Sequence, residues 1–130
     1  MKYADSFNDS ETIIASGATT YSDWFDTSWA NELCSFATFA EAVTGTTESI
    51  TVSLQRFSPI VTTGTDIAAH GALAAAGSDE LYVTSQIAGS TDLATKNKLG
   101  MRVRYKYVSS GTFSASQIVT MTMVLYAKRN

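Results

Sequence analysis

The side chains able to carry chemistry are few in this 130-residue chain and stand far apart in the sequence. The single histidine, His70, lies in an alanine-rich stretch with no partner at metal-ligand spacing, so we expect it to face solvent or to cap an element. Asp23 and Asp26 flank aromatic residues, which leaves a glycosidase-type carboxylate pair open beside the plainer interpretation of acidic residues in a surface turn. No phosphate-cradling glycine loop, nucleophile elbow or paired-cysteine motif occurs. We therefore expect a protein that is not an enzyme and that uses no cofactor or metal.

The only cysteine, Cys34, has no partner for an internal disulfide. It stands in the apolar run 33–37 without a basic or histidine neighbour that would stabilise a thiolate. We expect it to be a small buried hydrophobic residue.

The composition indicates one globular domain made of short strands. Hydrophobic residues make up 45% of the chain, 34 of the 130 residues are threonine or serine, and there is one proline. No apolar run is long enough to span a bilayer and the first residues are polar, so we expect neither a membrane segment nor a signal peptide. We expect a single domain over residues 1–130, in which residues 1–10 can form an extended N-terminal arm.

Alternating apolar and polar residues predict the strands. The alternation is clearest over 101–107, 118–127 and 49–57, with one apolar face on 118–127 made of Val119, Met121, Met123, Leu125 and Ala127. Shorter strands are expected at 12–15 and 81–85, and we favour a strand over a helix for 33–42. We expect 101–107 to form an antiparallel hairpin with 118–127, and 33–42 to form one with 49–57, because strands joined by short connections usually pair.

These elements predict an all-β fold, an antiparallel β-sandwich with a jelly-roll-like topology. The alanine-rich segment 66–77 is the exception, since Asp66 suits an N-cap and Gly77 a helix stop. We expect at most one short helix there, inserted between strands, with a loop as the alternative.

The charged residues are divided unevenly along the chain. Residues 1–95 hold all twelve acidic and two basic side chains, a net charge of −10, whereas residues 96–130 hold seven basic ones. The basic residues can pair with acidic strands of the same molecule or meet an acidic surface on a neighbour, and nucleic acid is disfavoured because the whole chain is acidic. The candidate interface residues are Arg102, Arg104, Lys106, Lys128 and Arg129.

The aromatic residues between positions 21 and 29 form a second candidate surface, made of Tyr21, Trp24, Phe25 and Trp29. Such rings stack on sugars and concentrate at protein interfaces. The alternative is that they close one end of the sandwich.

The order of several segments along the chain resembles that of small structural proteins of tailed bacteriophages. These segments are the stretch from Tyr21 to Ser28, TGTTESITVSLQ (44–55), LGMRVRYKY (99–107), an SSGTFS turn and a final strand ending at Lys128. The resemblance is one of pattern over about residues 20–128. It implies a head decoration or minor virion protein that attaches to a capsid shell as a homo-oligomer, with a trimer favoured, and that is made in the host cytoplasm and resides in the virion. The rival interpretation is a carbohydrate- or receptor-binding module of a phage fibre or a bacterial surface protein.

Overall fold

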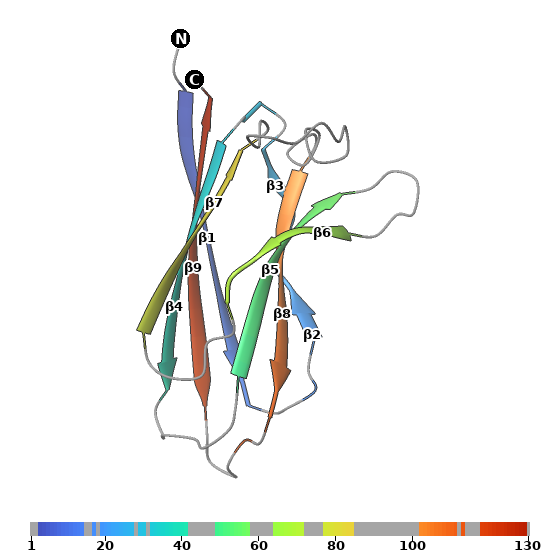
Figure 1. Ribbon diagram of the computed structural model, residues 1–130, viewed down its shortest axis with the longest axis vertical. Helices are drawn as coiled ribbons and strands as arrows, with labels where there is room; N and C mark the ends of the chain where they lie inside the picture. Colours follow the sequence, from blue (N-terminus) through green and yellow to red (C-terminus); the bar gives the residue numbers. More distant parts are fainter. Residues whose placement is uncertain are drawn as a thin grey trace.

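Two antiparallel sheets face each other across a shared core (Figure 1). The structure is a computed structural model that describes residues 3–14, 17, 19–27, 29–30, 32–41, 49–57, 64–71, 77–84, 102–111, 113 and 118–129. The strands are β1 (Tyr3–Ile13), β2 (Thr19–Tyr21), β3 (Phe25–Asp26), β4 (Glu32–Glu41), β5 (Ser49–Phe57), β6 (Gly64–Ala69), β7 (Gly77–Thr84), β8 (Arg102–Ser110) and β9 (Val119–Arg129).

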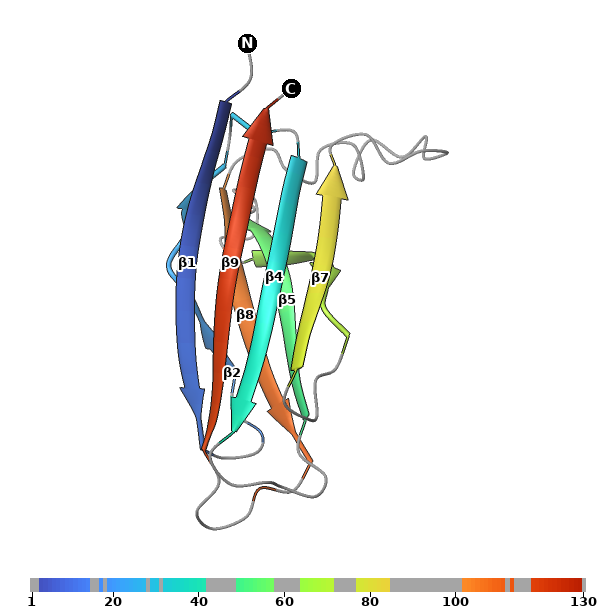
Figure 2. The same ribbon diagram turned by 90° about the vertical axis from the view of Figure 1, so that its left-hand side faces the viewer.

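The strand order confirms the predicted all-β sandwich and its jelly-roll topology. One sheet, which we call the β4 sheet, has the order β1-β9-β4-β7 and faces the viewer in Figure 2. The other, which we call the β8 sheet, has the order β2-β8-β5-β6, and β3 also pairs with β8 beyond the end of β2. With β2 and β3 counted as one interrupted edge strand, eight strands form two four-stranded sheets, as in a jelly roll.

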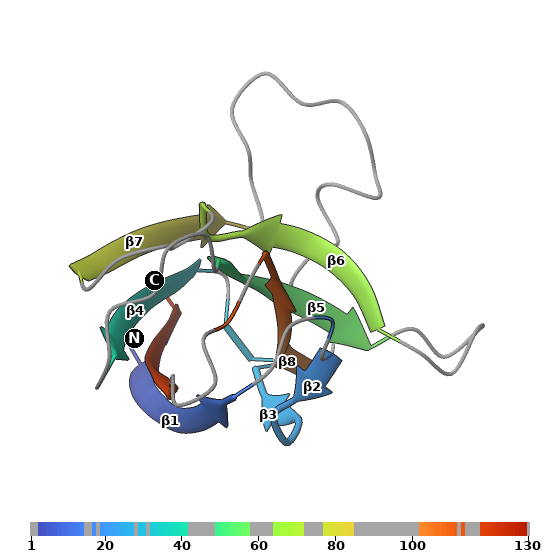
Figure 3. The same ribbon diagram turned by 90° about the horizontal axis from the view of Figure 1, so that it is seen from below.

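The alternating residues face the way the sequence predicts. Val119, Met121, Met123, Leu125 and Ala127 of β9 are fully buried, as are Val103, Tyr105 and Tyr107 of β8. Side chains of a strand alternate between the two faces of a sheet, so the intervening residues of both strands point away from the core. The view along the strands in Figure 3 shows the two layers that enclose this core.

The predicted hairpins are wrong. β8 pairs with β5 and β2, whereas β9 pairs with β1 and β4. Likewise β4 lies in one sheet and β5 in the other. The period of two settles which face of a strand is buried, but it does not identify the neighbouring strand. In this topology most connections cross from one sheet to the other.

The predicted helix is also wrong where the structure describes the segment. Residues 66–69 belong to β6 and Gly77 begins β7, while 72–76 lie outside the described residues. Ile67 points into the core and β6 pairs with β5, so burial and sheet pairing outweigh the helical preference of alanine. No described residue is helical. Residues 3–10, which the sequence allows to form an extended arm, are part of β1 and pair with β9.

Candidate functional site

The five candidate basic residues do not form one edge. Arg102, Arg104 and Lys106 lie on β8, on the outer face of the β8 sheet. Lys128 and Arg129 end β9 in the other sheet, where Lys128 Nζ lies 3.4 Å from Glu32 Oε2. Because β8 is flanked by β5 and by β2 and β3, the first three residues occupy the middle of a sheet face and not an edge.

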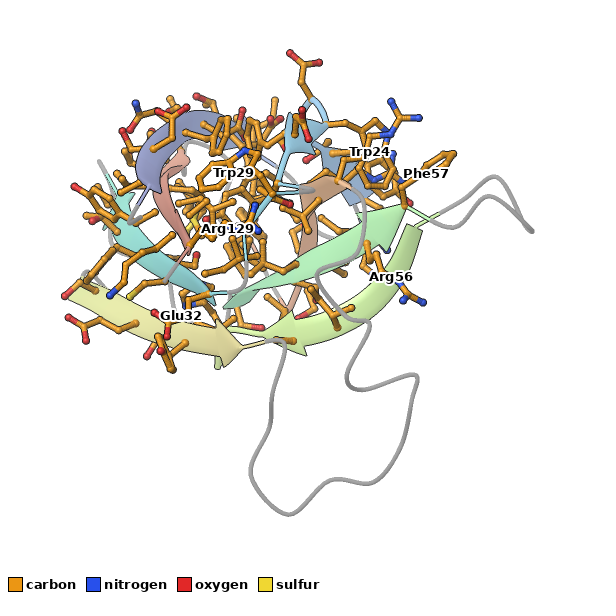
Figure 4. All side chains as sticks on the ribbon, turned by 90° about the horizontal axis from the view of Figure 1, so that it is seen from above. Trp24, Trp29, Glu32, Arg56, Phe57 and Arg129 are labelled. Atoms are coloured by element: carbon orange, nitrogen blue, oxygen red, sulfur yellow. The ribbon has the colours of Figure 1, made fainter. Side chains whose placement is uncertain are left out.

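The four aromatic residues also divide into two pairs. Phe25 stacks on Phe7 with ring centroids 5.0 Å apart, and Phe25 and Trp29 both pack against the core. This half closes the sandwich, as the alternative interpretation predicted. Tyr21 and Trp24 instead contact Arg104 on the outer side of the β8 sheet. Figure 4 shows Trp24 beside Phe57 at one side of the molecule and Trp29 between the layers.

The guanidinium of Arg104 lies over two aromatic rings. Its Cζ lies 4.0 Å from the centroid of Tyr21 and 4.4 Å from that of Trp24. Both distances are well within the range of a cation–π interaction. The guanidinium is therefore held in place by ring faces.

Arg102 is held in the same way at the next outward position of β8. Its Cζ lies 4.2 Å from the ring of Phe57 and 5.8 Å from that of Trp24. Trp24 and Phe57 meet edge to face at 5.6 Å. Trp24 thus lies near both arginines, and we call this group the Arg–aromatic surface: Tyr21, Trp24, Phe57, Arg102 and Arg104.

A network of polar side chains lies beside Arg104 and holds its position. Arg104 Nε donates to Gln55 Oε1 (3.0 Å), and Gln55 Nε2 donates to Asp66 Oδ1 (2.7 Å). Asp66 also forms an ion pair with Lys106 at 3.0 Å. Partial burial raises the pKa of Asp66, but the hydrogen bonds from Gln55 and Lys106 and the charge of Lys106 outweigh it, so that this pKa is lowered.

The charges of β8 are therefore used in two different ways. Lys106 is neutralised within the molecule, as is Lys128, which agrees with the intramolecular interpretation of the charge asymmetry. Among the described residues, neither Arg102 nor Arg104 forms an ion pair with a carboxylate. Arg102 and Arg104 are thus the charges of β8 for which the described residues supply no carboxylate, while aromatic rings contact both side chains.

Residue type alone does not predict that Phe57 belongs to the Arg–aromatic surface or that Gln55 and Asp66 support it. The alternation of 49–57 places Gln55 and Phe57 on the face opposite to the buried Leu54, and this was the available signal. That this face adjoins the one with Arg104 follows only from the register of β5 with β8.

A second cluster lies inside the sandwich and has the arrangement of a Ser-His-Asp triad. Ser35 Oγ lies 2.8 Å from His70 Nε2, and His70 Nδ1 lies 2.7 Å from Asp79 Oδ2. Ser35 Oγ also lies 2.6 Å from the hydroxyl of Tyr105. Sequence separations of 35 and 9 residues gave no hint of this cluster.

The prediction that His70 faces solvent or caps an element is wrong, because only 2% of its surface is exposed. Ser35 is completely buried, so no substrate carbonyl can approach its Oγ in this conformation. The geometry of a nucleophile and its base is present, but access is not. The cluster instead joins the two sheets, since Ser35 and Asp79 belong to the β4 sheet and Tyr105 to the β8 sheet.

One set of proton positions satisfies every member of this cluster. In this arrangement the carboxylate of Asp79 accepts from His70 Nδ1, His70 Nε2 accepts from Ser35, and Ser35 accepts from Tyr105. Burial raises the pKa of Tyr105 well above its usual value, which keeps this hydroxyl a donor. Tyr107, whose pKa is also raised by burial and by its hydrogen bond to Asp9, forms a second link between the sheets.

The remaining candidates for chemistry stand apart from both clusters. Asp23 and Asp26 are exposed. Cys34 is half-buried and faces outward from β4, so its expected place in the core is wrong; burial and the nearby Glu80 raise the pKa of its thiol. The described residues include no group of three or more histidine, cysteine or acidic side chains arranged to hold a metal ion. They also include no helix with the length and apolar character needed to cross a membrane.

Comparison with known proteins identifies the fold but no family. No protein-family model and no curated protein sequence matches the chain. Among solved structures, the chain is similar to the VP2 subviral particle protein of infectious bursal disease virus, with a TM-score of 0.50, 9% identity, and coverage of 99% of this chain and 37% of that one. The chain thus spans little more than a third of that capsid protein.

Two further solved structures have lower TM-scores. A subunit of the disulfide-linked pili of Bacillus endospore appendages has a TM-score of 0.48 and 13% identity, with 98% of this chain and 90% of that one covered. A Broad Bean Stain Virus protein has a TM-score of 0.43 and 11% identity, with 81% and 62% covered.

Proposed function

We propose that the chain is a structural protein of a virus particle, and more narrowly a decoration or cement protein of a tailed-phage head. In this proposal it binds the assembled shell through the Arg–aromatic surface, acts as a homo-oligomer and is made in the host cytoplasm. It contributes adhesion and no catalysis. Binding to the assembled state alone stabilises that state by mass action.

The observation that carries the proposal is the set of contacts made by Arg102 and Arg104. Arg102 and Arg104 are held by ring faces and, within the described structure, by no carboxylate. Arginine, tryptophan and tyrosine are the residues that contribute most at interface hot spots. The aromatic rings restrict the side chains of Arg102 and Arg104 before binding. A partner carboxylate can therefore form a bidentate contact with them at a lower entropic cost.

Two further facts support the virion role. The jelly-roll fold is one that a viral capsid protein shares, although a fold by itself does not set a function. The narrower assignment to a phage head depends on the sequence pattern over residues 20–128.

Cosedimentation with purified capsid shells tests the proposal. The double variant Arg102→Ala/Arg104→Ala should lose binding, whereas Lys128→Ala/Arg129→Ala, which removes the same charge from the other sheet, should retain it. Binding by the first variant equal to that of the unmodified protein would contradict the proposal, as would failure of the unmodified protein to bind any shell.

A carbohydrate- or receptor-binding module is the second candidate, favoured by one observation. Tyr21 is 48% exposed and Trp24 is half-buried on the same outward surface, so a sugar can reach the parts of these rings that Arg104 and Phe57 leave uncovered. Under this alternative, Trp24→Ala should abolish retention on a glycan column, and Trp29→Ala should leave it unchanged because Trp29 packs against the core. Retention that depends on Trp24, without shell binding, would replace the first proposal by the second.

A further inference from the structure

The outer face of the β4 sheet bears an exposed aromatic patch. Tyr82 is 61% exposed and Tyr126 is 51% exposed, and the ring of Tyr126 meets Phe36 edge to face at 5.7 Å. Cys34 and Val124 lie between these rings and are half-buried. No described segment crosses this face, which is turned to the viewer in Figure 2.

The register of the strands places these residues in rows across the sheet. One row contains Ser6, Tyr126, Cys34 and Tyr82, in the strand order β1, β9, β4 and β7. The next row contains Asn8, Val124, Phe36 and Glu80. On the other side of the first row, Lys128 of β9 lies beside Glu32 of β4.

The rows of one copy are complementary in side-chain size to those of a second copy when the two β4 sheets are packed outer face to outer face. The two-fold axis runs parallel to the strands, in the plane where the two outer faces meet, above the line midway between β9 and β4. Rotation about this axis places each β9 residue of one copy opposite the β4 residue of the same row in the other copy. Tyr126 then faces the small Cys34, and Phe36 faces Val124. At the flanks, Tyr82 faces Ser6.

The charges match under the same operation. Lys128 of each copy faces Glu32 of the other, so that the ion pair already present within each chain becomes an alternating ring of four charges. Any twist between the packed sheets displaces side chains most at the ends, where the long lysine side chain can follow. This matching of size and of charge about one axis is the property of an isologous interface.

We infer that the protein forms a symmetric dimer through the outer face of the β4 sheet, with a second copy of the chain as the occupant. The inference stands apart from the proposed shell attachment, which uses the opposite face of the sandwich. Four strands about 4.8 Å apart, each with about eight residues at 3.3 Å, give a footprint of roughly 500 Å² per copy. This is less than the roughly 800 Å² per partner of a standard interface, so the dimer should be weak and depend on protein concentration.

Two charge reversals test the axis. Lys128→Glu places glutamate opposite glutamate in the homodimer, and Glu32→Lys places lysine opposite lysine. Each variant alone should dimerise at least about tenfold more weakly than the unmodified protein, which corresponds to about 1.4 kcal/mol. Mixed together, the two variants should form a heterodimer, because both facing pairs are then of opposite charge although neither chain has an internal ion pair.

Sedimentation equilibrium over a range of concentrations measures the association of the unmodified protein, of each variant alone and of the mixture. Arg129→Glu is the matched control, since its side chain leaves the strand on the opposite side to Lys128, and it should dimerise like the unmodified protein. Circular dichroism verifies that each variant is folded. An unmodified protein that stays monomeric at the highest soluble concentration, or a mixture that remains monomeric when both variants are folded, would overturn the inference.

Discussion

Ser35→Ala removes the central member of the buried cluster that joins the two sheets. Ser35 Oγ lies within hydrogen-bond distance of both His70 Nε2 and the hydroxyl of Tyr105. His70 and Tyr105 are buried, with 2% and 0% of their surfaces exposed, so water does not replace the lost hydroxyl. The substitution therefore leaves one acceptor and one donor unsatisfied inside the sandwich.

The size of the effect follows from that count. A buried polar group that loses its partner costs about 1–3 kcal/mol, so the two groups together should lower the free energy of unfolding by roughly 2–6 kcal/mol. Tyr105→Phe should cost less, about 1 kcal/mol, because Ser35 still donates to His70. Ser49→Ala is the matched control, because Ser49 Oγ also forms a short hydrogen bond, 2.7 Å from Ser110 Oγ. That bond is exposed to solvent, so its loss should change stability by no more than about 0.5 kcal/mol.

Urea denaturation, followed by circular dichroism and analysed with a common m-value, measures the three differences. The expected order of destabilisation is Ser35→Ala, then Tyr105→Phe, then Ser49→Ala. If Ser35→Ala costs no more than Ser49→Ala, the cluster does not stabilise the contact between the sheets and the reasoning is refuted.

Three further predictions concern the support of the Arg–aromatic surface and the buried tyrosines. A Cβ at Gly64 would lie 2.9 Å from Gln55 Cβ and closer still to its amide, so Gly64→Ala should displace Gln55 and lower the free energy of unfolding by about 1–3 kcal/mol; an unchanged thermal midpoint would contradict this. Asp66→Asn should cost under about 1 kcal/mol at neutral pH, because the Asp66 side chain is half exposed. The pKa of Asp66 is lowered on folding, so its contribution to stability is present above the unfolded value near 3.8 and is lost as the pH falls through the folded value. A difference in unfolding free energy between variant and unmodified protein that is no smaller at pH 2 than at pH 7 would refute the assignment. The pKa values of Tyr105 and Tyr107 are raised, so their stabilising contribution is present below the unfolded value near 10 and is lost as the pH rises towards the folded values; in an alkaline absorbance titration they should ionise only as the protein unfolds, and ionisation of all six tyrosines near pH 10 in the folded state would contradict this.

The burial of individual strands could be predicted from the sequence, because the period of two is a local property. The inward faces of β8 and β9 are the predicted ones, and the ambiguous segment 33–42 is the strand β4 (Glu32–Glu41). Strand pairing could not be predicted in this way. Alternation is the same whether β8 pairs with β9 or with β5, and the choice depends on how all the strands together cover one core.

The candidate site could be predicted only in part, for the same reason. Residue type identified Arg102, Arg104, Tyr21 and Trp24, but not that they stack on one another. Their contact requires β2 and β8 to be neighbours in a register that places Tyr21 opposite Lys106. Trp29 has the same composition signal as Trp24 yet packs against the core, since the sequence does not specify on which side of the sheet each ring lies.

The most direct test of the proposed function is a cryo-electron microscopy map of the native particle that carries this protein. We predict density for the sandwich on the shell, with the outer face of the β8 sheet turned towards the capsid and with Arg102 and Arg104 at the contact. A particle without the protein, or one in which this face points to solvent, would contradict it.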